Sequence, residues 1–141
     1  MEWPAHVGHL PFDEVTSTLD VARQHAGQTA GATWITAARQ TASRGRRGRP
    51  WVAPVGNFYG TLLIPCTDPM LASHRSFVAA LALRDALEAV MGTGPKLELK
   101  WPNDVLLNSG KVAGILLESV AFQGQMWGCL LYTSPSPRDR G

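Results

Sequence analysis

The fold is decided by residues 97–122, which read LELKWPNDVLLNSGKVAGILLESVAF. Apolar runs in this stretch are separated by turn residues and fall at Leu97–Trp101, Val105–Leu107 and Lys111–Phe122. Short runs bounded by Asn, Pro, Gly or Ser are typical of neighbouring antiparallel strands. The stretch therefore predicts a three-strand meander with a tight turn at Asn108–Gly110, and a final strand is expected to begin near Gln125.

Upstream of the meander, short strands alternate with helices. Ser17 or Thr18 can cap a helix that begins at about Leu19 and runs to His25, and Gly27 is expected to end it. The pattern of apolar and β-branched residues predicts strands at Leu10–Thr16, Ala32–Ala38 and Asn57–Pro65. Between the last two, residues 39–55 have no hydrophobic period and are predicted to form a long loop, which compact domains seldom carry without a function.

A second helix is expected from about Ser73 to Met91. It carries a narrow polar stripe of Arg84, Asp85 and Glu88, and its expected packing face consists of Ala80, Leu83, Leu87 and Val90. So narrow a polar face predicts a largely buried helix packed on a sheet. Strands and helices followed by antiparallel strands indicate an α+β fold, with a mixed, largely antiparallel sheet backed by helices.

The composition is that of an ordinary globular domain. Of 141 residues, 45% are hydrophobic and 17% are charged, and no apolar run has the length of a membrane span. The N-terminus lacks a secretory signal, so a cytoplasmic location without membrane association is expected. The two cysteines, Cys66 and Cys129, form no paired motif and fit a reducing compartment. The four histidines have no metal-ligand spacing, and no metal site is expected.

The last residues depart from the pattern. Residues 129–141 read CLLYTSPSPRDRG, which ends in a Ser, Pro and Arg run without periodicity. This ending is similar to translated sequencing-adapter sequence. We therefore expect one domain over residues 1–128, and a non-native or disordered tail over residues 129–141.

Four arginines within six residues dominate the long loop, in the sequence Arg44-Gly45-Arg46-Arg47-Gly48-Arg49-Pro50-Trp51. Guanidinium groups stay charged and bind phosphate or carboxylate in a forked geometry. The two glycines allow the backbone to approach an anion closely. The loop is neither a Walker loop nor a dinucleotide-binding fingerprint. Taken alone, it fits a nucleotide pocket, a nucleic-acid surface or a solvated basic loop.

Two further motifs lie in the meander. Residues 100–104 (KWPND) form a polar turn between strands, and residues 111–118 (KVAGILLE) form an apolar strand with a charge at each end. Each is also compatible with an ordinary structural role, as an Asx-type turn and as a core strand.

The order of the three motifs resembles the catalytic domain of biotin protein ligases over about residues 10–128, cut off at the C-terminus. The resemblance implies a class II synthetase-like fold related to lipoate ligases, here incomplete. It also implies an ATP-dependent ligase that forms biotinyl-5′-adenylate and transfers biotin to a lysine of a biotin carboxyl carrier protein. ATP with Mg²⁺ and biotin would be substrates, without a tightly bound cofactor.

The resemblance also assigns site residues. Catalytic roles fall to Arg46 and Lys111. The implied biotin-binding residues are Ser17, Thr18, Gln40, Arg44, Gly45, Arg46, Lys111, Gly114, Ile115 and Leu116. The implied nucleotide-binding residues are Arg44, Arg46, Arg47, Arg49, Trp51, Asn103, Asp104 and Lys111.

The chain departs from the family pattern at two positions, because Leu19 stands where an Asn is frequent and Ser43 stands where a Gly is common. A homodimer is possible, and DNA binding is not expected because no helix-turn-helix precedes the domain. The shortened chain is expected to be weakly active at best. The alternatives are a ligase of the same fold for lipoate or another short carboxylate, and a nucleic-acid-binding module that uses the arginine loop.

Overall fold

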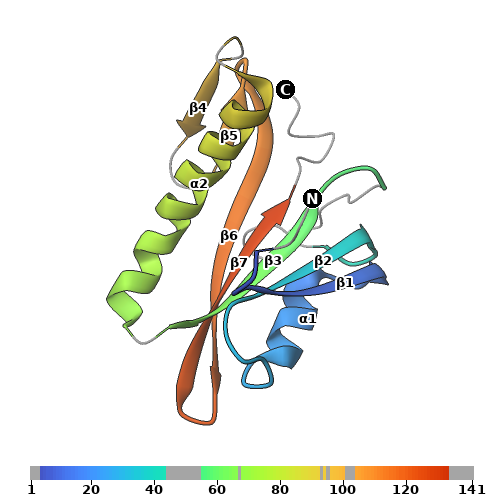
Figure 1. The fold of residues 1–141 in the computed structure, drawn as a ribbon, viewed down its shortest axis with the longest axis vertical. Coiled ribbons are helices and arrows are strands. Elements are labelled where there is room, and N and C mark those ends of the chain that lie inside the picture. The colour runs from blue at the N-terminus through green and yellow to red at the C-terminus, as the bar shows by residue number, and fades with distance from the viewer. Residues whose placement is uncertain are drawn as a thin grey trace.

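The computed structural model describes residues 4–43, 55–66, 68–92, 94, 96–100 and 104–133. Within them, seven strands form one sheet in the order β1-β2-β3-β7-β6-β5-β4 (Figure 1). The β1–β2 pair is parallel and all other pairs are antiparallel. The elements in chain order are β1 (Gly8–Val15), α1 (Thr18–His25), β2 (Thr33–Gln40), β3 (Tyr59–Cys66), α2 (Pro69–Met91), β4 (Leu97–Lys100), β5 (Asp104–Leu107), β6 (Gly110–Phe122) and β7 (Gln125–Thr133). The predicted α+β class and the meander are confirmed.

The turns of the meander follow from local sequence. Asn108 and Ser109, between β5 and β6, have φ angles of 49° and 70°. Gln123 and Gly124, between β6 and β7, have φ angles of 48° and 80°. Two consecutive residues with positive φ give the turn whose twist matches that of antiparallel strands. The strand that follows β6 therefore folds straight back along it.

Helix α1 lies on one face of the sheet. Its N-cap is Ser17, whose hydroxyl accepts a hydrogen bond from the Asp20 backbone N–H at 3.0 Å. The α1 side of the sheet holds a core cluster made of Leu19, Ala22, Ala26, Ile35, Leu63, Trp127, Cys129 and Leu131. An ion pair between Arg23 on α1 and Glu118 on β6 also ties the helix to the sheet.

Helix α2 lies on the other face of the sheet. Successive side chains of a strand point to opposite faces, so each central strand contributes residues to both faces. Leu62, Ile64 and Leu130 alternate with the residues under α1 and pack in a second core cluster with Ala79 and Ala80 of α2. The helix begins at Pro69, earlier than predicted. Asp68 caps it by accepting a hydrogen bond from the Met70 N–H at 2.9 Å, with a proline in the first turn.

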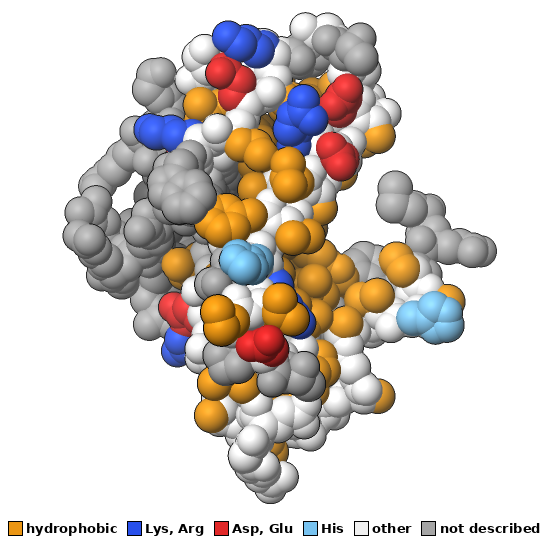
Figure 2. Space-filling view, turned by 90° about the vertical axis from the view of Figure 1, so that its left-hand side faces the viewer, with side chains coloured by type: hydrophobic (Ala, Val, Ile, Leu, Met, Phe, Trp, Pro, Cys, Tyr) orange, Lys and Arg blue, Asp and Glu red, His pale blue; other side chains and the backbone are white. Residues whose placement is uncertain are grey.

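The prediction that α2 is largely buried is wrong. Ala80, Leu83 and Leu87 do face the sheet, but Val90 is 84% exposed and Val78 is 62% exposed. The reason is that α2 packs on one face of one sheet, and no second layer among the described residues covers its outer side. Figure 2 shows the molecule from the side on which α2 lies, with apolar side chains (orange) exposed on the surface. No described helix is both long enough and apolar enough to cross a membrane.

The expected domain end at residue 128 falls inside β7, which continues to Thr133 between β3 and β6. The side chains of Cys129, Leu130 and Leu131 are 0%, 4% and 3% exposed. Residues 129–133 thus pair in the middle of the sheet because their apolar side chains fill both core clusters. The part of the expected tail at residues 134–141 lies outside the described residues.

The end of α1 provides a stability test. Gly27 has a φ angle of +81°, and a Cβ added there would lie 2.2 Å from the ring Cδ1 of Phe122. We expect Gly27→Ala to lower the free energy of unfolding by about 2–3 kcal/mol, from left-handed strain plus displacement of the ring. Gly124→Ala is the matched control, because Gly124 has a φ of +80° with open space around its Cβ. Urea denaturation should give a smaller loss there, about 1 kcal/mol. Equal losses would contradict the proposed Phe122 contact.

Candidate functional site

A buried polar cluster lies at the N-terminal end of α1. The Oε1 atom of Gln40, at the end of β2, accepts hydrogen bonds from the Thr18 backbone N–H at 2.8 Å and from the Thr18 hydroxyl at 3.1 Å. The Thr18 hydroxyl also lies 2.9 Å from the hydroxyl of Thr61 on β3. Thr18, Gln40 and Thr61 are 0%, 4% and 0% exposed. Three strand and helix segments distant in sequence therefore build one cluster.

This cluster leaves one donor unused. The Nε2 atom of Gln40 is buried and has no hydrogen-bond partner among the described residues. A buried donor without a partner costs free energy, and such groups are rare in folded proteins. Because Oε1 is held by Thr18, Nε2 can act only by donating to something else. The cluster therefore suits a ligand that presents a hydrogen-bond acceptor.

A cation lies on a neighbouring part of the sheet. The Nζ atom of Lys111 on β6 is 3.3 Å from Oδ1 of Asp104 on β5, and the two side chains are 18% and 21% exposed. A Cβ added at Gly114 would lie 3.3 Å from Cε and 3.4 Å from Nζ of Lys111. Gly114 thus leaves room for the lysine side chain to lie across β6. The arrangement holds an ammonium group in a partly buried place, where it interacts strongly with an anion.

The buried amide and the cation share one face of the sheet. Leu116 packs against the core cluster under α1, whereas Ile115 belongs to the cluster under α2. Thr61 on β3 and Leu116 on β6 both pair with Leu131 on β7, so the three lie in one row. Two strand spacings of about 4.8 Å separate β3 from β6, or roughly 10 Å. The face therefore has a neutral donor and a cation at its two ends, with apolar side chains between them.

The structure brings together only part of the predicted site. Thr18, Gln40, Lys111, Gly114 and Asp104 lie on or beside this face. Ser17 is buried and serves as the helix cap, and Leu116 contributes to the apolar floor. The side chain of Ile115 lies on the opposite face. The predicted arginine loop and the remaining turn residue lie outside the described residues, namely Arg44, Gly45, Arg46, Arg47, Arg49, Trp51 and Asn103.

The two departures from the family pattern are buried. Leu19 is 3% exposed and packs in the core cluster under α1, so its apolar side chain contributes to packing instead of a polar contact. Ser43, just before the arginine loop, is 6% exposed.

Sequence reasoning missed Thr61 and Tyr59. Both are almost completely buried on the α1 face of β3, at 0% and 1% exposed. Burial raises the pKa of Tyr59, although a hydrogen bond with Asn57 partly opposes the rise. The phenol is therefore neutral at ordinary pH. In the sequence, both residues have the pattern of common strand formers. Thr61 is marked only by its contact with Thr18, and Tyr59 only by its burial on the same face of β3.

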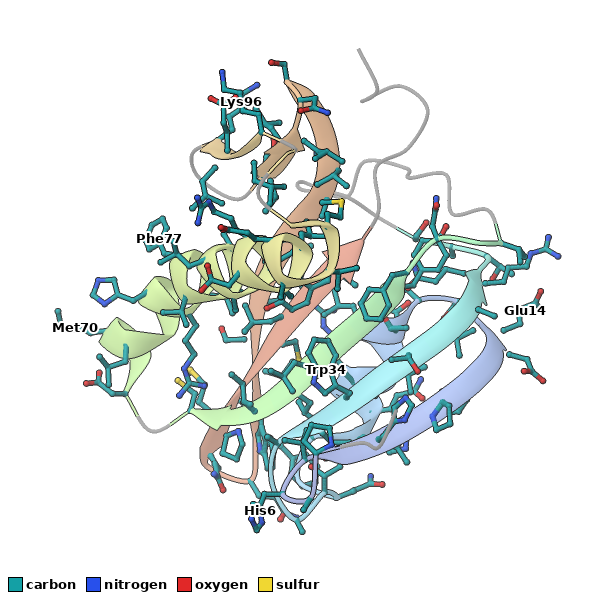
Figure 3. The ribbon with its side chains drawn as sticks, turned by 45° about the horizontal axis from the view of Figure 1, so that its top comes forward. His6, Glu14, Trp34, Met70, Phe77 and Lys96 are labelled. Atoms are coloured by element: carbon teal, nitrogen blue, oxygen red, sulfur yellow. The ribbon has the colours of Figure 1, made fainter. Side chains whose placement is uncertain are left out.

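Three other features of the described residues are a cavity, the His, Cys, Asp and Glu side chains, and the two cysteines. A cavity of about 390 Å³ lies between α2 and the opposite face of the sheet, and Trp34, Leu83 and Leu87 are among its apolar lining residues. Trp34 is labelled in Figure 3. Among the described residues, no three His, Cys, Asp or Glu side chains gather to hold a metal. Cys66 and Cys129 are free and buried, and burial raises the pKa of Cys129 to about 11 despite the opposing effect of Arg23.

The fold is that of an α+β domain, and this face suits an elongated molecule with an acceptor at one end and an anion at the other. The model of the Biotin/lipoate A/B protein ligase family matches residues 10–131. The chain belongs to this family.

Individual relatives agree with the family assignment. The chain is 56% identical over 104 residues to a biotin–[acetyl-CoA-carboxylase] ligase of Paracoccus denitrificans, covering 73% of this chain and 43% of that protein. It is 36% identical over 118 residues to the human biotin–protein ligase, covering 77% of this chain and 16% of that protein. The chain therefore spans less than half the length of these curated relatives.

Solved structures show the same fold. The biotin protein ligase of Leishmania major, in complex with biotinyl-5-AMP, matches with a TM-score of 0.75 and 31% identity, covering 92% of this chain and 57% of that one. The biotin protein ligase of Aquifex aeolicus, in complex with biotin and ATP, matches with a TM-score of 0.73 and 26% identity, covering 95% of this chain and 58% of that one. The fold of this chain is that of a biotin protein ligase catalytic domain.

Proposed function

We propose that this chain is part of the catalytic domain of an ATP-dependent biotin protein ligase. The observation that carries the proposal is the single sheet face with the buried Gln40 amide donor of β2 near α1 and the Lys111 ammonium of β6 on the far side of β3 and β7. Biotin has a urea carbonyl at one end and a carboxylate at the other, joined by an apolar bicycle and tail. Its two polar ends match the two ends of this face, and its apolar middle matches the floor between them.

The biotin end of the proposed site comes from the polar cluster. Nε2 of Gln40 would donate to the urea oxygen, with Thr18 holding the amide and Ser17 capping the helix behind it. Leu116 would contact the apolar part of the ligand. Ile115 can take part only through its main chain, because its side chain packs under α2.

Lys111 would act in the first chemical step. In this step an oxygen of the biotin carboxylate attacks the α-phosphorus of ATP, a new P–O bond forms, and the bond to the pyrophosphate oxygen breaks. The reacting groups are both anionic, so positioned cations lower the barrier by offsetting their repulsion. Lys111 would supply one such cation from the described residues, and the resemblance to the family implies others at Arg44, Arg46, Arg47 and Arg49. Trp51 and Asn103 complete the proposed nucleotide site.

The second step would transfer biotin. The amine of a target lysine attacks the acyl carbon of biotinyl-5′-adenylate, a C–N bond forms, the C–O bond to phosphate breaks, and AMP leaves. The proton lost by the amine goes to solvent. We propose that a biotin carboxyl carrier protein supplies the target lysine and that the ligase forms a homodimer. The same Lys111 ammonium would neutralise the departing phosphate.

Mg²⁺ would enter with ATP as part of the substrate. Mg²⁺ is bound mostly through phosphate oxygens, waters and one or two carboxylates. Asp104 would meet this requirement as a carboxylate next to Lys111, with which it forms an ion pair. No larger set of ligands is needed for a metal that arrives already bound to ATP.

A direct test compares ligands on the same preparation. We expect calorimetry to show biotin binding, and biotin to raise pyrophosphate release from MgATP at least ~10-fold above lipoate, since discrimination of that size needs about 1.4 kcal/mol. An oligonucleotide should bind only in low salt, because phosphate contacts weaken steeply as salt rises. A larger response to lipoate would favour the related ligase. Oligonucleotide binding that persists at physiological salt, with no response to biotin, would support the nucleic-acid alternative.

A further inference from the structure

We propose that Thr61 is a positioning residue that fixes the Gln40 amide with its N–H₂ group toward the ligand. The inference rests on the proposed function for the identity of that ligand. Thr61 lies on β3 and belongs to none of the sequence motifs. Its role follows from which atom donates each hydrogen bond in the buried cluster.

The direction of each hydrogen bond in the cluster is determined. The Thr18 backbone N–H can only donate, so the Gln40 atom 2.8 Å away must be the amide oxygen. That oxygen can only accept, so the Thr18 hydroxyl donates its one proton to it at 3.1 Å. The remaining 2.9 Å contact between the two threonine hydroxyls must then be donated by Thr61. The chain of donors runs from Thr61 to Thr18 to Gln40.

Burial makes this chain hard to replace. Thr18 and Thr61 are both 0% exposed, so water is not at hand to take the place of either hydroxyl. Without Thr61, the Thr18 oxygen loses its incoming hydrogen bond, and the Thr18 hydroxyl is free to turn away from Gln40. Hydrogen bonds in a chain also strengthen one another in a low-dielectric interior. Thr61 therefore holds the Thr18 hydroxyl in place, and Thr18 holds the amide.

The fixed amide makes the site selective for acceptors. With Oε1 occupied, the group that Gln40 presents is the Nε2 donor, which has no partner among the described residues. A urea oxygen satisfies this donor. An analogue of biotin whose urea oxygen is replaced by an imino group presents a donor instead. A site built around a buried hydrogen-bonding group rejects such analogues strongly, because the buried group is then left unpaired.

The test uses four variants of the chain. Thr61→Val removes the hydroxyl while keeping the β-branched shape, and Thr61→Ser restores the hydroxyl. Thr36→Val is the matched control, because Thr36 is a strand threonine whose hydroxyl lies 2.7 Å from Nε2 of the exposed His9, away from the buried cluster. Gln40→Glu identifies the side-chain amide signal of Gln40 in a nitrogen–proton NMR spectrum by its disappearance.

We expect Thr61→Val to shift or split the Gln40 amide signal and to weaken biotin binding about 10-fold, the effect of losing one buried hydrogen bond. The ratio of the affinity for biotin to the affinity for the imino analogue should decrease as well. Thr61→Ser should recover both properties, and Thr36→Val should change neither. A residue that only stabilised the strand would alter the melting temperature without altering the ratio of the two affinities.

Two results would overturn the inference. One is a Gln40 amide signal that is the same in Thr61→Val as in the parent, a readout that needs no ligand. The other is an unchanged ratio of biotin to imino-analogue affinity in Thr61→Val. Absence of biotin binding by the parent would instead count against the proposed function, and the amide signal would still decide the role of Thr61.

Discussion

Lys111→Gln is expected to reduce biotin-dependent pyrophosphate release by about 100- to 1000-fold, which is the usual cost of removing one group that stabilises charge in a transition state. The glutamine keeps a polar side chain of similar but shorter length beside Gly114 and removes the charge. The measurement is the initial rate of pyrophosphate release with saturating MgATP and biotin. A rate within threefold of the parent would show that the ammonium does not act at the reacting phosphate.

A second substitution, at the ion-pair partner Asp104, separates the effect of Lys111 on the reaction rate from its effect on stability. Removing Lys111 leaves the Asp104 carboxylate, which is 21% exposed, without the ammonium 3.3 Å away. We expect a loss of about 1–2 kcal/mol in unfolding free energy, because a mostly buried charge is left less compensated. The double variant Lys111→Gln with Asp104→Asn removes both charges and should recover most of the stability but none of the activity. Recovery of activity in the double variant would make the lysine structural.

Arg46→Ala is expected to have a comparable effect on adenylate formation, about 100-fold or more, because it removes a guanidinium from the loop assigned to the carboxylate and phosphate. Arg46 lies outside the described residues, so this expectation depends on its place in the sequence motif. Arg39→Ala is the matched control: Arg39 is an exposed residue near the end of β2, paired with Glu14 at 3.6 Å. It changes the net charge equally and should leave the rate within about twofold, as exposed ion pairs contribute little. Equal losses in both variants would point to a general charge effect.

Much of the fold could be predicted because its signals are local. Ser17 as a helix cap, Gly27 beyond the helix end and the turn at Asn108 all follow from the residues within one turn of each position. The strands and helices accordingly fall within a few residues of their predicted bounds. The exposure of Val90 could not be predicted in this way. Periodicity identifies apolar faces, but whether a face is covered depends on which layers surround it.

The site, like the fold, has features that local sequence predicts and features that only the tertiary structure determines. The sequence by itself determined the chemical groups: a cluster of guanidinium groups, a lysine beside a glycine on an apolar strand, and a polar turn that ends in Asp104. These are short-range patterns, and their residue types carry their chemistry wherever the chain places them.

Only the tertiary structure decided which groups meet. It placed β3 and β7 between β2, which carries Gln40, and β6, which carries Lys111, and this order sets the spacing of the two polar ends. It also brought Thr61 to Thr18 across 43 positions of sequence, and so fixed which atom of the Gln40 amide is free to bind. The physical reason is that strand order and register arise from non-local pairing and shared burial, which depend on the whole sheet and which no local pattern encodes.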